Sequence, residues 1–358
     1  MTLSILSHQR LHSQGLAGTP FTDAGQVVRW LGAVQSQDYA AAKWAVGQRA
    51  GTLTDAAIEQ SFAAGAILRT HVMRPTWHFV APADIRWLLA LTAPRVHAAN
   101  AYHYRSLELD RALFDRSNAT ISKTLQGGCQ LTRLELASAL RGAGIDASDL
   151  RLVYLIVSAE LDGVICSGAR RGKQFTYALL DERVPAAKTL TRDKALAELT
   201  RRYFTSHGPA TAADYIWWSG LTHLDVQTGL EMVKGELEQE TLDGNTYWFA
   251  ASALPAQSAP HAVYLLPNYD EFVVGYTDRS AIYDASYAVN LDGRRNPLFQ
   301  HTLLIDGRIA GTWRRTVKKS SVVIEPNPFT PLSDSAELAL SKAAHRYAGF
   351  LGLPLGGK

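Results

Sequence analysis

The feature that most constrains the fold is an order of elements that recurs three times in the first two thirds of the chain. Each time, stretches with apolar residues at helical spacing are followed by two short strands rich in branched and aromatic residues. Helices followed by a β-hairpin are the elements of a winged helix. The sequence therefore predicts an α+β protein with three tandem winged-helix domains, over residues 1–112, 113–186 and 187–255.

The three hairpins are the clearest part of this pattern. We expect the first to turn at Arg74-Pro75, the second to have a basic turn and the third to have an Asp-Gly turn. Two helices, over residues 82–91 and 96–111, are expected to bridge the first domain to the second. The hairpin sequences, in chain order, are ILRTHVMRPTWHFVAP, VICSGARRGKQFTYALL and TLDGNTYWFA.

The last part of the chain has a different composition. A Pro- and Ala-rich segment, LPAQSAPHAV, predicts a linker. Beyond it lie predicted strands, including a hairpin with an Asp306-Gly307 turn, and a final helix capped by Ser333 or Asp334. We expect residues 256–358 to form a small antiparallel, β-barrel-like domain closed by that helix.

Composition excludes several classes of protein. The two cysteines, Cys129 and Cys166, are too few for a disulfide scaffold or a cysteine-rich metal site. The N-terminus lacks the pattern of a secretion signal, and no apolar run reaches the ~18 residues of a membrane span. We therefore expect a soluble, cytoplasmic protein without a metal. The formal net charge of +3 neither requires nor excludes nucleic acid.

Two glutamines, Gln35 and Gln37, lie one residue apart between two predicted helices. A buried helix is expected over residues 26–34, and Asp38 has the position of an N-cap for the helix that begins at Tyr39. Within a helix the two side chains would point about 200° apart, whereas an extended segment directs both to one side. We therefore predict a helix–helix junction at which both amides face one cleft.

Basic residues on the second hairpin are candidate DNA contacts. Arg170, Arg171 and Lys173 lie on a glycine-containing turn, where the backbone can approach phosphates closely. A winged helix commonly places such a turn along the DNA backbone. The alternative is a solvated surface turn.

Further basic residues have weaker patterns. Arg314 and Arg315 occupy a predicted strand and point to its opposite faces, so that only one of them can meet a given partner. Arg294 and Arg295 lie in a polar loop that either reaches into a groove or is a plain surface loop. Lys43, on the helix after the glutamines, completes the candidate DNA contacts.

Three residues of the first hairpin, His71, Arg74 and His78, are candidates for lining the glutamine cleft. The two histidines are seven residues apart and would face opposite sides of an unbroken strand, but a turn at Arg74 changes that relation. The alternative for each histidine is a structural role.

Five blocks resemble the winged-helix DNA glycosylases of the AlkZ type. They run along nearly the whole chain in the order of that family. The resemblance implies three winged helices and a β-barrel around duplex DNA, and removal of N-alkylated purines, in some members by unhooking interstrand crosslinks. The blocks are VVRWLGAVQSQDYAAAKWA, RPTWHFV, GARRGKQFTYALLDE, LLPNYDEFVVGYTDRS and DGRIAGTWRR.

The catalytic motif of that family is glutamine, an aliphatic residue, then glutamine or aspartate. It maps onto Gln35, Ser36 and Gln37, with Ser36 departing from the aliphatic pattern. Glutamine instead of aspartate at position 37 resembles the crosslink-unhooking branch. His71, Arg74 and His78 then become candidates for contacts to phosphate or lesion.

The chemistry makes a pair of amides believable as catalytic groups. A purine alkylated at N7 or N3 is cationic and already a good leaving group, so that no general acid is needed. Amide carbonyls can hold a water and stabilise an oxocarbenium-like sugar, although an amide is no conventional base. We therefore expect a monomeric, monofunctional DNA glycosylase of base excision repair, acting on alkylated or crosslinked double-stranded DNA without a cofactor.

Two other classes of function remain open from the residues. A non-enzymatic winged-helix transcriptional regulator would be a dimer on a palindromic site, with the glutamines capping helices. A protein-binding scaffold would have no affinity for DNA.

Overall fold

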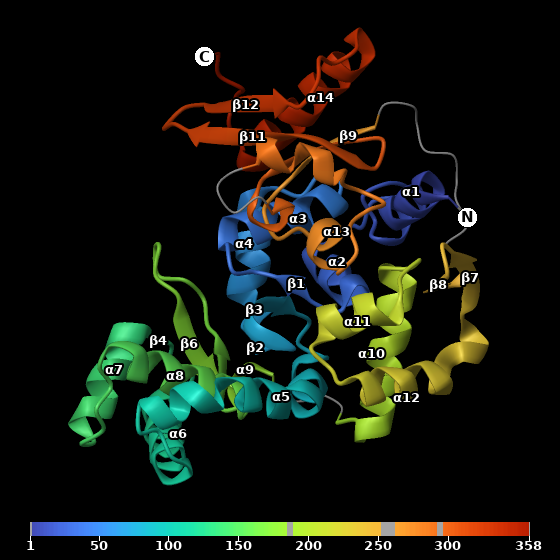
Figure 1. The fold of residues 1–358 in the computed structure, drawn as a ribbon. Helices are drawn as coiled ribbons and strands as arrows, with labels where there is room; N and C mark the ends of the chain where they lie inside the picture. The colour runs from blue at the N-terminus through green and yellow to red at the C-terminus, as the bar shows by residue number, and fades with distance from the viewer. Residues whose placement is uncertain (1, 185–188, 252–261, 292–295, 358) are drawn as a thin grey trace. The chain divides into compact units, whose positions relative to one another are not determined.

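The computed structural model describes residues 2–184, 189–251, 262–291 and 296–357. Arg294 and Arg295 lie outside the described residues. Helices and antiparallel sheets alternate along the chain (Figure 1), so the predicted α+β class is confirmed. The chain divides into two compact units: Met1–Glu59, Ala197–Trp218 and Thr222–Lys358 form the first, Gln60–Leu196 and Ser219–Leu221 the second.

The first unit begins with helices whose N-termini are capped by side chains. Thr2, Asp23 and Asp38 each accept a hydrogen bond from the backbone N–H three residues further on. The N-cap that the sequence predicted at Asp38 is thus confirmed. The elements are α1 (Leu3–Ser13), α2 (Ala24–Leu31), β1 (Val34–Gln35), α3 (Tyr39–Arg49) and α4 (Asp55–Ala64).

The next helices of this unit lead into the predicted hairpin. Its turn is at Asp243 and Gly244, whose φ angles of 48° and 77° are those that a type I′ turn requires. Thr222 and Asp225 form a capping box at the start of the helix that begins at His223. The elements are α10 (Arg192–Ser206), α11 (Ala212–Ser219), α12 (His223–Val233), η1 (Lys234–Glu236), β7 (Glu238–Leu242) and β8 (Asn245–Phe249).

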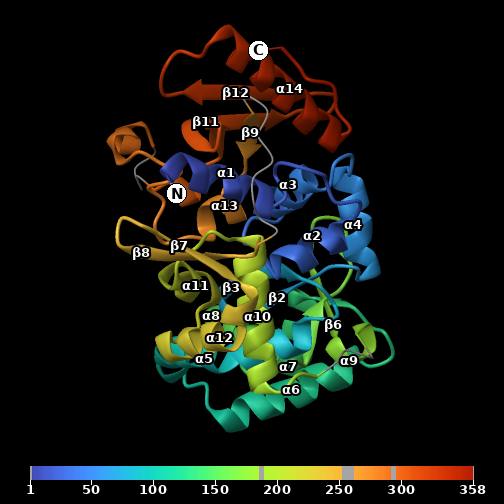
Figure 2. The same cartoon turned by 90° about the vertical axis from the view of Figure 1, so that its right-hand side faces the viewer.

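The C-terminal part contains an open antiparallel sheet of four strands in the order β12-β11-β10-β9. Helix α14 packs against β9 (Figure 1, Figure 2). Asp306 and Gly307, with φ of 48° and 78°, make the predicted tight turn. The elements are β9 (Val263–Leu266), α13 (Glu271–Val274), η3 (Ala285–Asn290), η4 (Pro297–Phe299), β10 (Thr302–Ile305), β11 (Arg308–Val317), β12 (Val322–Pro328) and α14 (Asp334–Leu351).

The barrel-like shape expected for this part is therefore wrong: within the described residues no sheet closes on itself. Part of the stretch VYLLPNYDEFVVGY, in which we expected strand, instead forms the helix α13. The polar stretch after it contains two short 3₁₀ helices. Four strands are also fewer than the eight or so of a small closed barrel. An edge strand next to a helix is protected without closure.

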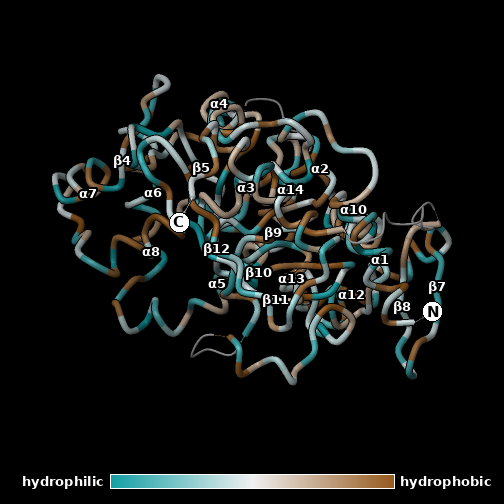
Figure 3. The backbone as a smooth tube through the Cα atoms, turned by 90° about the horizontal axis from the view of Figure 1, so that it is seen from above, coloured by the Kyte–Doolittle hydropathy of each residue, from teal (hydrophilic) through white to brown (hydrophobic). Residues whose placement is uncertain are grey.

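One core of the first unit joins its N-terminal helix to this sheet. Leu6 and Leu11 of α1 belong to the same buried cluster as Phe272, Leu304 and Ile309. Figure 3 shows how hydrophobic and hydrophilic residues alternate along the backbone. The hydrophobic face of an amphipathic element is the one that packs into a core. Residues more than 250 positions apart in sequence thus share a core.

The second unit contains the first two hairpins and the helices between them. Its three-stranded sheet has the order β4-β6-β5, and α6, α7 and α8 cover a core that includes Leu136, Leu155 and Ile165. The elements are β2 (Leu68–Val72), β3 (Arg74–Val80), α5 (Ile85–Ser106), α6 (Arg111–Leu125), β4 (Leu131–Thr132), α7 (Arg133–Gly142), α8 (Asp149–Leu161), β5 (Ile165–Ser167), β6 (Thr176–Leu179) and α9 (Leu180–Arg183).

Helix α5 differs from the two bridging helices that the sequence predicted. It is continuous over 22 residues and contains Pro94. Proline removes one helical hydrogen bond and usually ends or kinks a helix. Here Leu88, Leu91 and Val96, before and after the proline, are all buried, so tertiary packing stabilises one helix across the position.

The described residues contain no helix with the length and hydropathy needed to cross a membrane. They also contain no cluster of three or more His, Cys, Asp or Glu residues arranged to hold a metal ion.

Candidate active site and nucleic-acid interface

The glutamine segment, residues 34–37, joins α2 to α3, as the sequence predicted: Val34 and Gln35 are extended as β1, and Gln37 lies in a bend before α3. Gln35 is 9% exposed, Ser36 is fully buried and Gln37 is exposed. Neighbouring residues of an extended chain point to opposite sides, so Ser36 points away from Gln35, and it is the more completely buried of the two. Ser36 therefore occupies the inward position at which the resembling family has an aliphatic side chain. That both amides face one cleft stays a prediction.

A buried carboxylate holds this segment in place. The backbone N–H of Gln35 donates to Oε1 of Glu271 over 2.8 Å. The other oxygen, Oε2, accepts from the indole N–H of Trp218 over 2.9 Å and lies 3.5 Å from Nε2 of His207. Glu271, Trp218 and His207 are fully buried. Glu271 can therefore position the segment but cannot itself touch a substrate.

The residue next to Glu271 fixes the helix that follows the glutamines. Asp270 accepts two hydrogen bonds from Arg49, at the end of α3, over 2.8 and 2.9 Å. Arg49 also donates to the backbone and side-chain oxygens of Gln14, each over 2.9 Å. Both members of the ion pair are fully buried. Asp270 and Glu271 thus hold the C-terminal end of α3 and Gln35, respectively, at the start of the short helix α13.

Electrostatics favour a fixed arrangement at this point. Burial lowers the pKa of His207, against the opposing effect of its hydrogen bond to Glu271. A bidentate arginine–carboxylate pair in a low-dielectric interior has a strict geometry. The glutamines consequently lie on a segment with a preorganised support, as electrostatic catalysis requires.

Sequence reasoning missed Asp270 and Glu271 as site residues, although it singled out the block that contains them. The signal was available. Two adjacent carboxylates within an apolar run are rarely buried unless they are paired. The sequence could not show which distant residues pair with them.

Lys43 does not have the environment of a DNA contact. Its Nζ lies 2.9 Å from Asp55 Oδ2 and 2.9 Å from Glu59 Oε2, and the residue is 5% exposed. Its charge is neutralised by these two carboxylates, so Lys43 is not placed to bind a DNA phosphate.

The candidates of the first hairpin lie in the second unit. The hairpin turns at Met73, with φ of 65°, and Arg74-Pro75 begins β3, so the predicted turn position is wrong. His71 pairs with Trp77 across the strands and Thr70 pairs with His78. Directly opposed residues share a face, so His71 and His78 point to opposite faces and cannot line one cleft together.

Each histidine has a structural environment of its own. His71 Nδ1 lies 2.5 Å from Oε2 of Glu160 on α8, and both residues are buried. His78 is buried, with Nδ1 3.1 Å from the carbonyl of Thr76. These contacts favour the structural alternative for both histidines.

Helix α8 is largely covered by its neighbours. Residues 155–161 are all buried, and the helix packs against α5, α6 and β2. In a helix-turn-helix, the corresponding helix enters the major groove and reads bases. The exposed start of α8 offers Asp149 and Leu150, and Arg151 there donates to the carbonyl of Leu107. This helix therefore has no open face along its second half for a groove.

The basic turn between β5 and β6 is exposed, and its residues differ. Arg171 is paired with Glu135 over 2.8 Å, and this hydrogen bond lowers the pKa of Glu135 to about 2. The guanidinium of Arg170 lies 5.3 Å from the ring centre of Phe175. Lys173 is exposed at the turn. The turn can thus meet an anionic partner chiefly through Lys173 and Arg170.

The basic residues of the C-terminal sheet have unequal exposure. Arg314 is exposed on β11, whereas Arg315 is half-buried with Nη1 3.2 Å from His301 Nε2. The prediction that they face opposite sides of a strand agrees with this difference. Arg314 is the better placed of the two for a surface contact.

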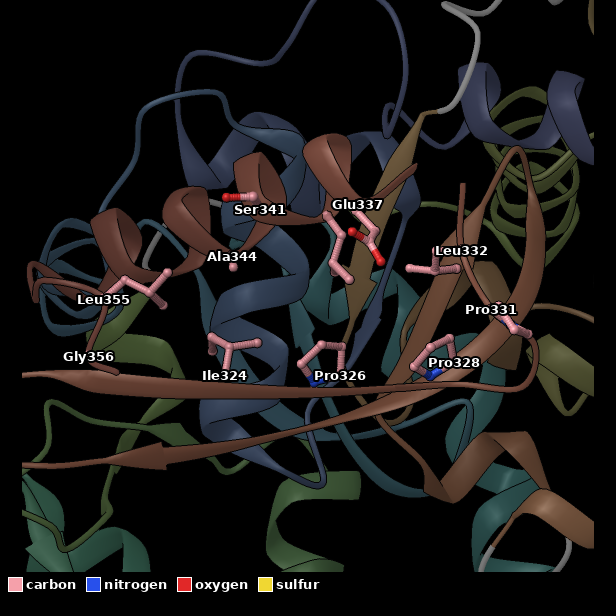
Figure 4. Close-up of a pocket in the computed structure, with 11 residues that line it drawn as sticks. Ile324, Pro326, Pro328, Pro331, Leu332, Glu337, Ser341, Ala344, Leu355 and Gly356 are labelled. Atoms are coloured by element: carbon pink, nitrogen blue, oxygen red, sulfur yellow. The ribbon is translucent and has the colours of Figure 1, made fainter. Parts of the chain in front are cut away.

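A cavity of 510 Å³ lies between β12 and α14 of the first unit. Figure 4 shows Ile324, Pro326 and Pro328 on the strand side and Ala344 on the helix side. The lining is mostly apolar and its one charged side chain is that of Glu337. An acidic, apolar lining does not suit a DNA phosphate.

Comparison with known proteins agrees with these features. Residues 28–350 match the family described as DNA glycosylase AlkZ-like, which defines the class as enzymes that act on N-glycosyl bonds in DNA. The chain belongs to the AlkZ-like DNA glycosylase family. The family resemblance of the sequence is thereby confirmed.

Two relatives place the similarity more closely. The chain is 23% identical over 340 residues to an interstrand DNA cross-link repair glycosylase of Streptomyces sahachiroi, covering 90% of this chain and 89% of that protein. The structure of the present chain is similar to that of the Streptomyces sahachiroi DNA glycosylase AlkZ, with a TM-score of 0.79, 21% identity and 99% of both chains covered. The structural likeness shows that the two share a fold.

Proposed function

We propose that this DNA glycosylase hydrolyses the N-glycosidic bond of purines alkylated at N7 or N3 in double-stranded DNA, with Gln35 and Gln37 as its catalytic residues. The observation that carries the proposal is the glutamine segment itself. It joins α2 to α3, it exposes Gln37 beside the nearly buried Gln35, and the backbone N–H of Gln35 is hydrogen-bonded to the buried Glu271 over 2.8 Å. A family of DNA glycosylases supplies the reaction class.

The proposed chemistry needs only what amides can do. A cationic purine leaves without protonation, and the sugar becomes oxocarbenium-like as the bond stretches. The carbonyl of Gln37, which is exposed, and that of Gln35, which is nearly buried, direct negative dipoles at that charge and accept from a water near C1′. The proton of the water passes to solvent, since an amide does not hold it. The enzyme is monofunctional in this scheme.

Crosslinked purines are proposed as a further substrate. The Streptomyces sahachiroi relative is named an interstrand cross-link repair glycosylase, and this chain has glutamine at both ends of the motif. A bulky crosslink cannot be swung into a snug pocket. The exposure of Gln37 supports attack on such a lesion from outside the base stack.

For the architecture, we propose winged helices at residues 1–112, 113–186 and 187–255, followed by the sheet and helix of residues 256–358. In each of the three segments the described residues hold helices followed by an antiparallel hairpin. The DNA contacts proposed on them are Arg170, Arg171, Lys173 and Arg314. Arg315 lies half-buried on the other side of the strand, beside His301. The enzyme acts as a monomer in this proposal.

The covered second half of α8 supports a glycosylase over a sequence-specific regulator. A regulator reads bases through a helix in the major groove. With residues 155–161 buried within its own unit, α8 is unsuited to that task. Contacts to the backbone, which are indifferent to sequence, are what a repair enzyme needs.

The test is single-turnover release of the base from a duplex with one N7-methylguanine. Wild type is compared with Gln35→Ala, Gln37→Ala and the double variant, and with Gln26→Ala as a matched control on the exposed surface of α2. We expect each site variant to lose about 100-fold in rate at unchanged DNA affinity, as for removal of one preorganised dipole. Tight binding without base release by wild type, on this duplex and on a crosslinked one, would refute the proposal.

A further inference from the structure

We propose that a pocket in the second unit binds one nucleotide unit of a DNA strand through its phosphodiester group; this rests on the proposed action on DNA. The cationic pocket, as we name it, has a volume of 340 Å³, within the ~300–1,000 Å³ range of ligand sites. Its lining includes the cations Arg69, Arg133 and Lys173 and no acidic residue.

Arg69 forms the inner wall of the cationic pocket. It lies on β2 and is 7% exposed, and its backbone N–H donates to Ser167 Oγ over 2.8 Å. The guanidinium carbon is 4.3 Å from the ring centre of Trp77 and 4.4 Å from that of Phe175. Rings at these distances attract the cation and hold its plane. A planar guanidinium held this way is preorganised for phosphate.

The other two cations lie at the mouth of the pocket, where both are exposed. Arg133 is the first residue of α7, and the positive N-terminal end of that ten-residue helix adds to the positive potential there. Lys173 comes from the turn between β5 and β6. The nearby carboxylate of Glu135 is engaged by Arg171 and by Thr132 at the start of α7. Three separate elements thus bring positive charge to one cavity.

The shape of the pocket indicates more than a bare anion. Three cations around 340 Å³ leave room beyond a phosphate group. Leu134, 70% exposed, contributes an apolar wall at the mouth. A sugar attached to the phosphate would pack on such a wall, whereas free inorganic phosphate would gain nothing from it. Because the second half of α8 is covered, this pocket is a contact to a DNA strand that the second hairpin domain offers without that helix.

The test is the salt dependence of duplex binding by the full chain. Removing one contact between a basic side chain and a phosphate reduces the steepness of log affinity against log salt concentration by about 0.9. We expect that reduction, with a several-fold loss of affinity at low salt, for Arg133→Ala and for Lys173→Ala. Arg141→Ala is the matched control, because it is an exposed arginine at the other end of α7 and does not line the pocket. Both pocket variants avoid the buried Arg69, so folding is not at risk.

Two further arms identify the ligand. Leu134→Ser should weaken duplex binding several-fold with no change of salt slope, because it removes only the apolar wall. Inorganic phosphate, titrated by calorimetry, should bind wild type far more weakly than a 5′-phosphorylated thymidine dinucleotide. Slopes of Arg133→Ala and Lys173→Ala that match Arg141→Ala overturn the proposal, as does equal binding of the two probes. Failure of base release by wild type would leave these slopes intact, so the two proposals fail separately.

Discussion

Two buried arginines show how differently the two units use the same side chain. Arg49 of the first unit is fully buried and bonded twice to Asp270, so its charge is neutralised where it lies. Arg69 of the second unit is held between the rings of Trp77 and Phe175 and lines a cavity. Aromatic rings restrain a cation without cancelling its charge. The first arginine stabilises the support of the glutamine segment, and the second forms a wall of the cationic pocket.

The largest effect should come from removing the carboxylate that holds the glutamine segment. Glu271→Ala leaves the N–H groups of Gln35 and Trp218 buried without this acceptor, each at a cost of about 1–3 kcal/mol. We expect base release to fall by about 100-fold with DNA affinity kept, because Gln35 loses its position.

Glu271→Gln is the matched variant, since its amide oxygen can still accept one of the two hydrogen bonds. It should recover at least part of the base-release rate. A Glu271→Ala protein that is less stable in urea but releases base at the wild-type rate would mean that the carboxylate supports only the fold.

Exchanging the two arginines for methionine tests the comparison directly. Arg49→Met leaves a buried Asp270 without its partner, and we expect a loss of about 3–5 kcal/mol in the free energy of unfolding. Arg69→Met loses contacts worth about 0.5–2 kcal/mol, but should weaken DNA binding several-fold. Denaturant titration and duplex affinity are measured on both. The opposite assignment, with stability lost at position 69 and affinity at 49, would invert the roles given above.

A pH effect should come from the first unit. Burial, and then the nearby Arg315, lower the pKa of His301 from 6.5 to about 4. The unfolded chain therefore binds a proton between these values that the folded chain does not. Stability from the neutral ring is complete above pH 6.5 and falls by about 1.4 kcal/mol per pH unit down to about pH 4.

From pH 7 to pH 5 this amounts to roughly 2 kcal/mol. Urea unfolding at several pH values measures it, with His301→Gln as the comparison variant. An equally steep decline in His301→Gln would assign the acid sensitivity to other groups.

The smallest effect is a difference between the two cysteines of the second unit. Cys129 is exposed, whereas Cys166 is buried and burial raises its pKa to about 12. The thiolate is the reactive form. A thiol reagent at pH 8 should therefore label one cysteine in the native protein and two in urea. Rapid native labelling of Cys166 would show that the second unit, and the wall of its pocket, opens readily.

Local features of the fold could be predicted from the sequence because their causes are local. Asp38 caps α3 and the Asp-Gly pairs make the tight turns, since capping and turn geometry depend on a few neighbouring residues. The position of the glutamines at a junction between two helices followed from the same signals. The roles of Gln35 and Gln37, and the domain limits, stay predictions.

What the sequence did not reveal depends on distant contacts. The bond from Gln35 to Glu271 spans 236 positions, and no spacing rule connects them. Two helices were predicted over residues 82–91 and 96–111, but the buried residues on both sides of Pro94 keep α5 continuous. The predicted barrel is wrong because the apolar residues after β9 form the helix α13 and not a further strand, which leaves an open sheet. Strand propensity depends on such tertiary context.

The covered α8 has a consequence for how such an enzyme finds its target. A glycosylase that contacts only the DNA backbone at undamaged sites has no preferred sequence there, so every undamaged site competes equally for it. Its search then depends on how briefly it stays at each site, and ionic strength sets that residence because backbone contacts release counterions. Weak, salt-dependent binding to undamaged DNA then allows a rapid search for lesions. Tighter nonspecific binding would slow repair.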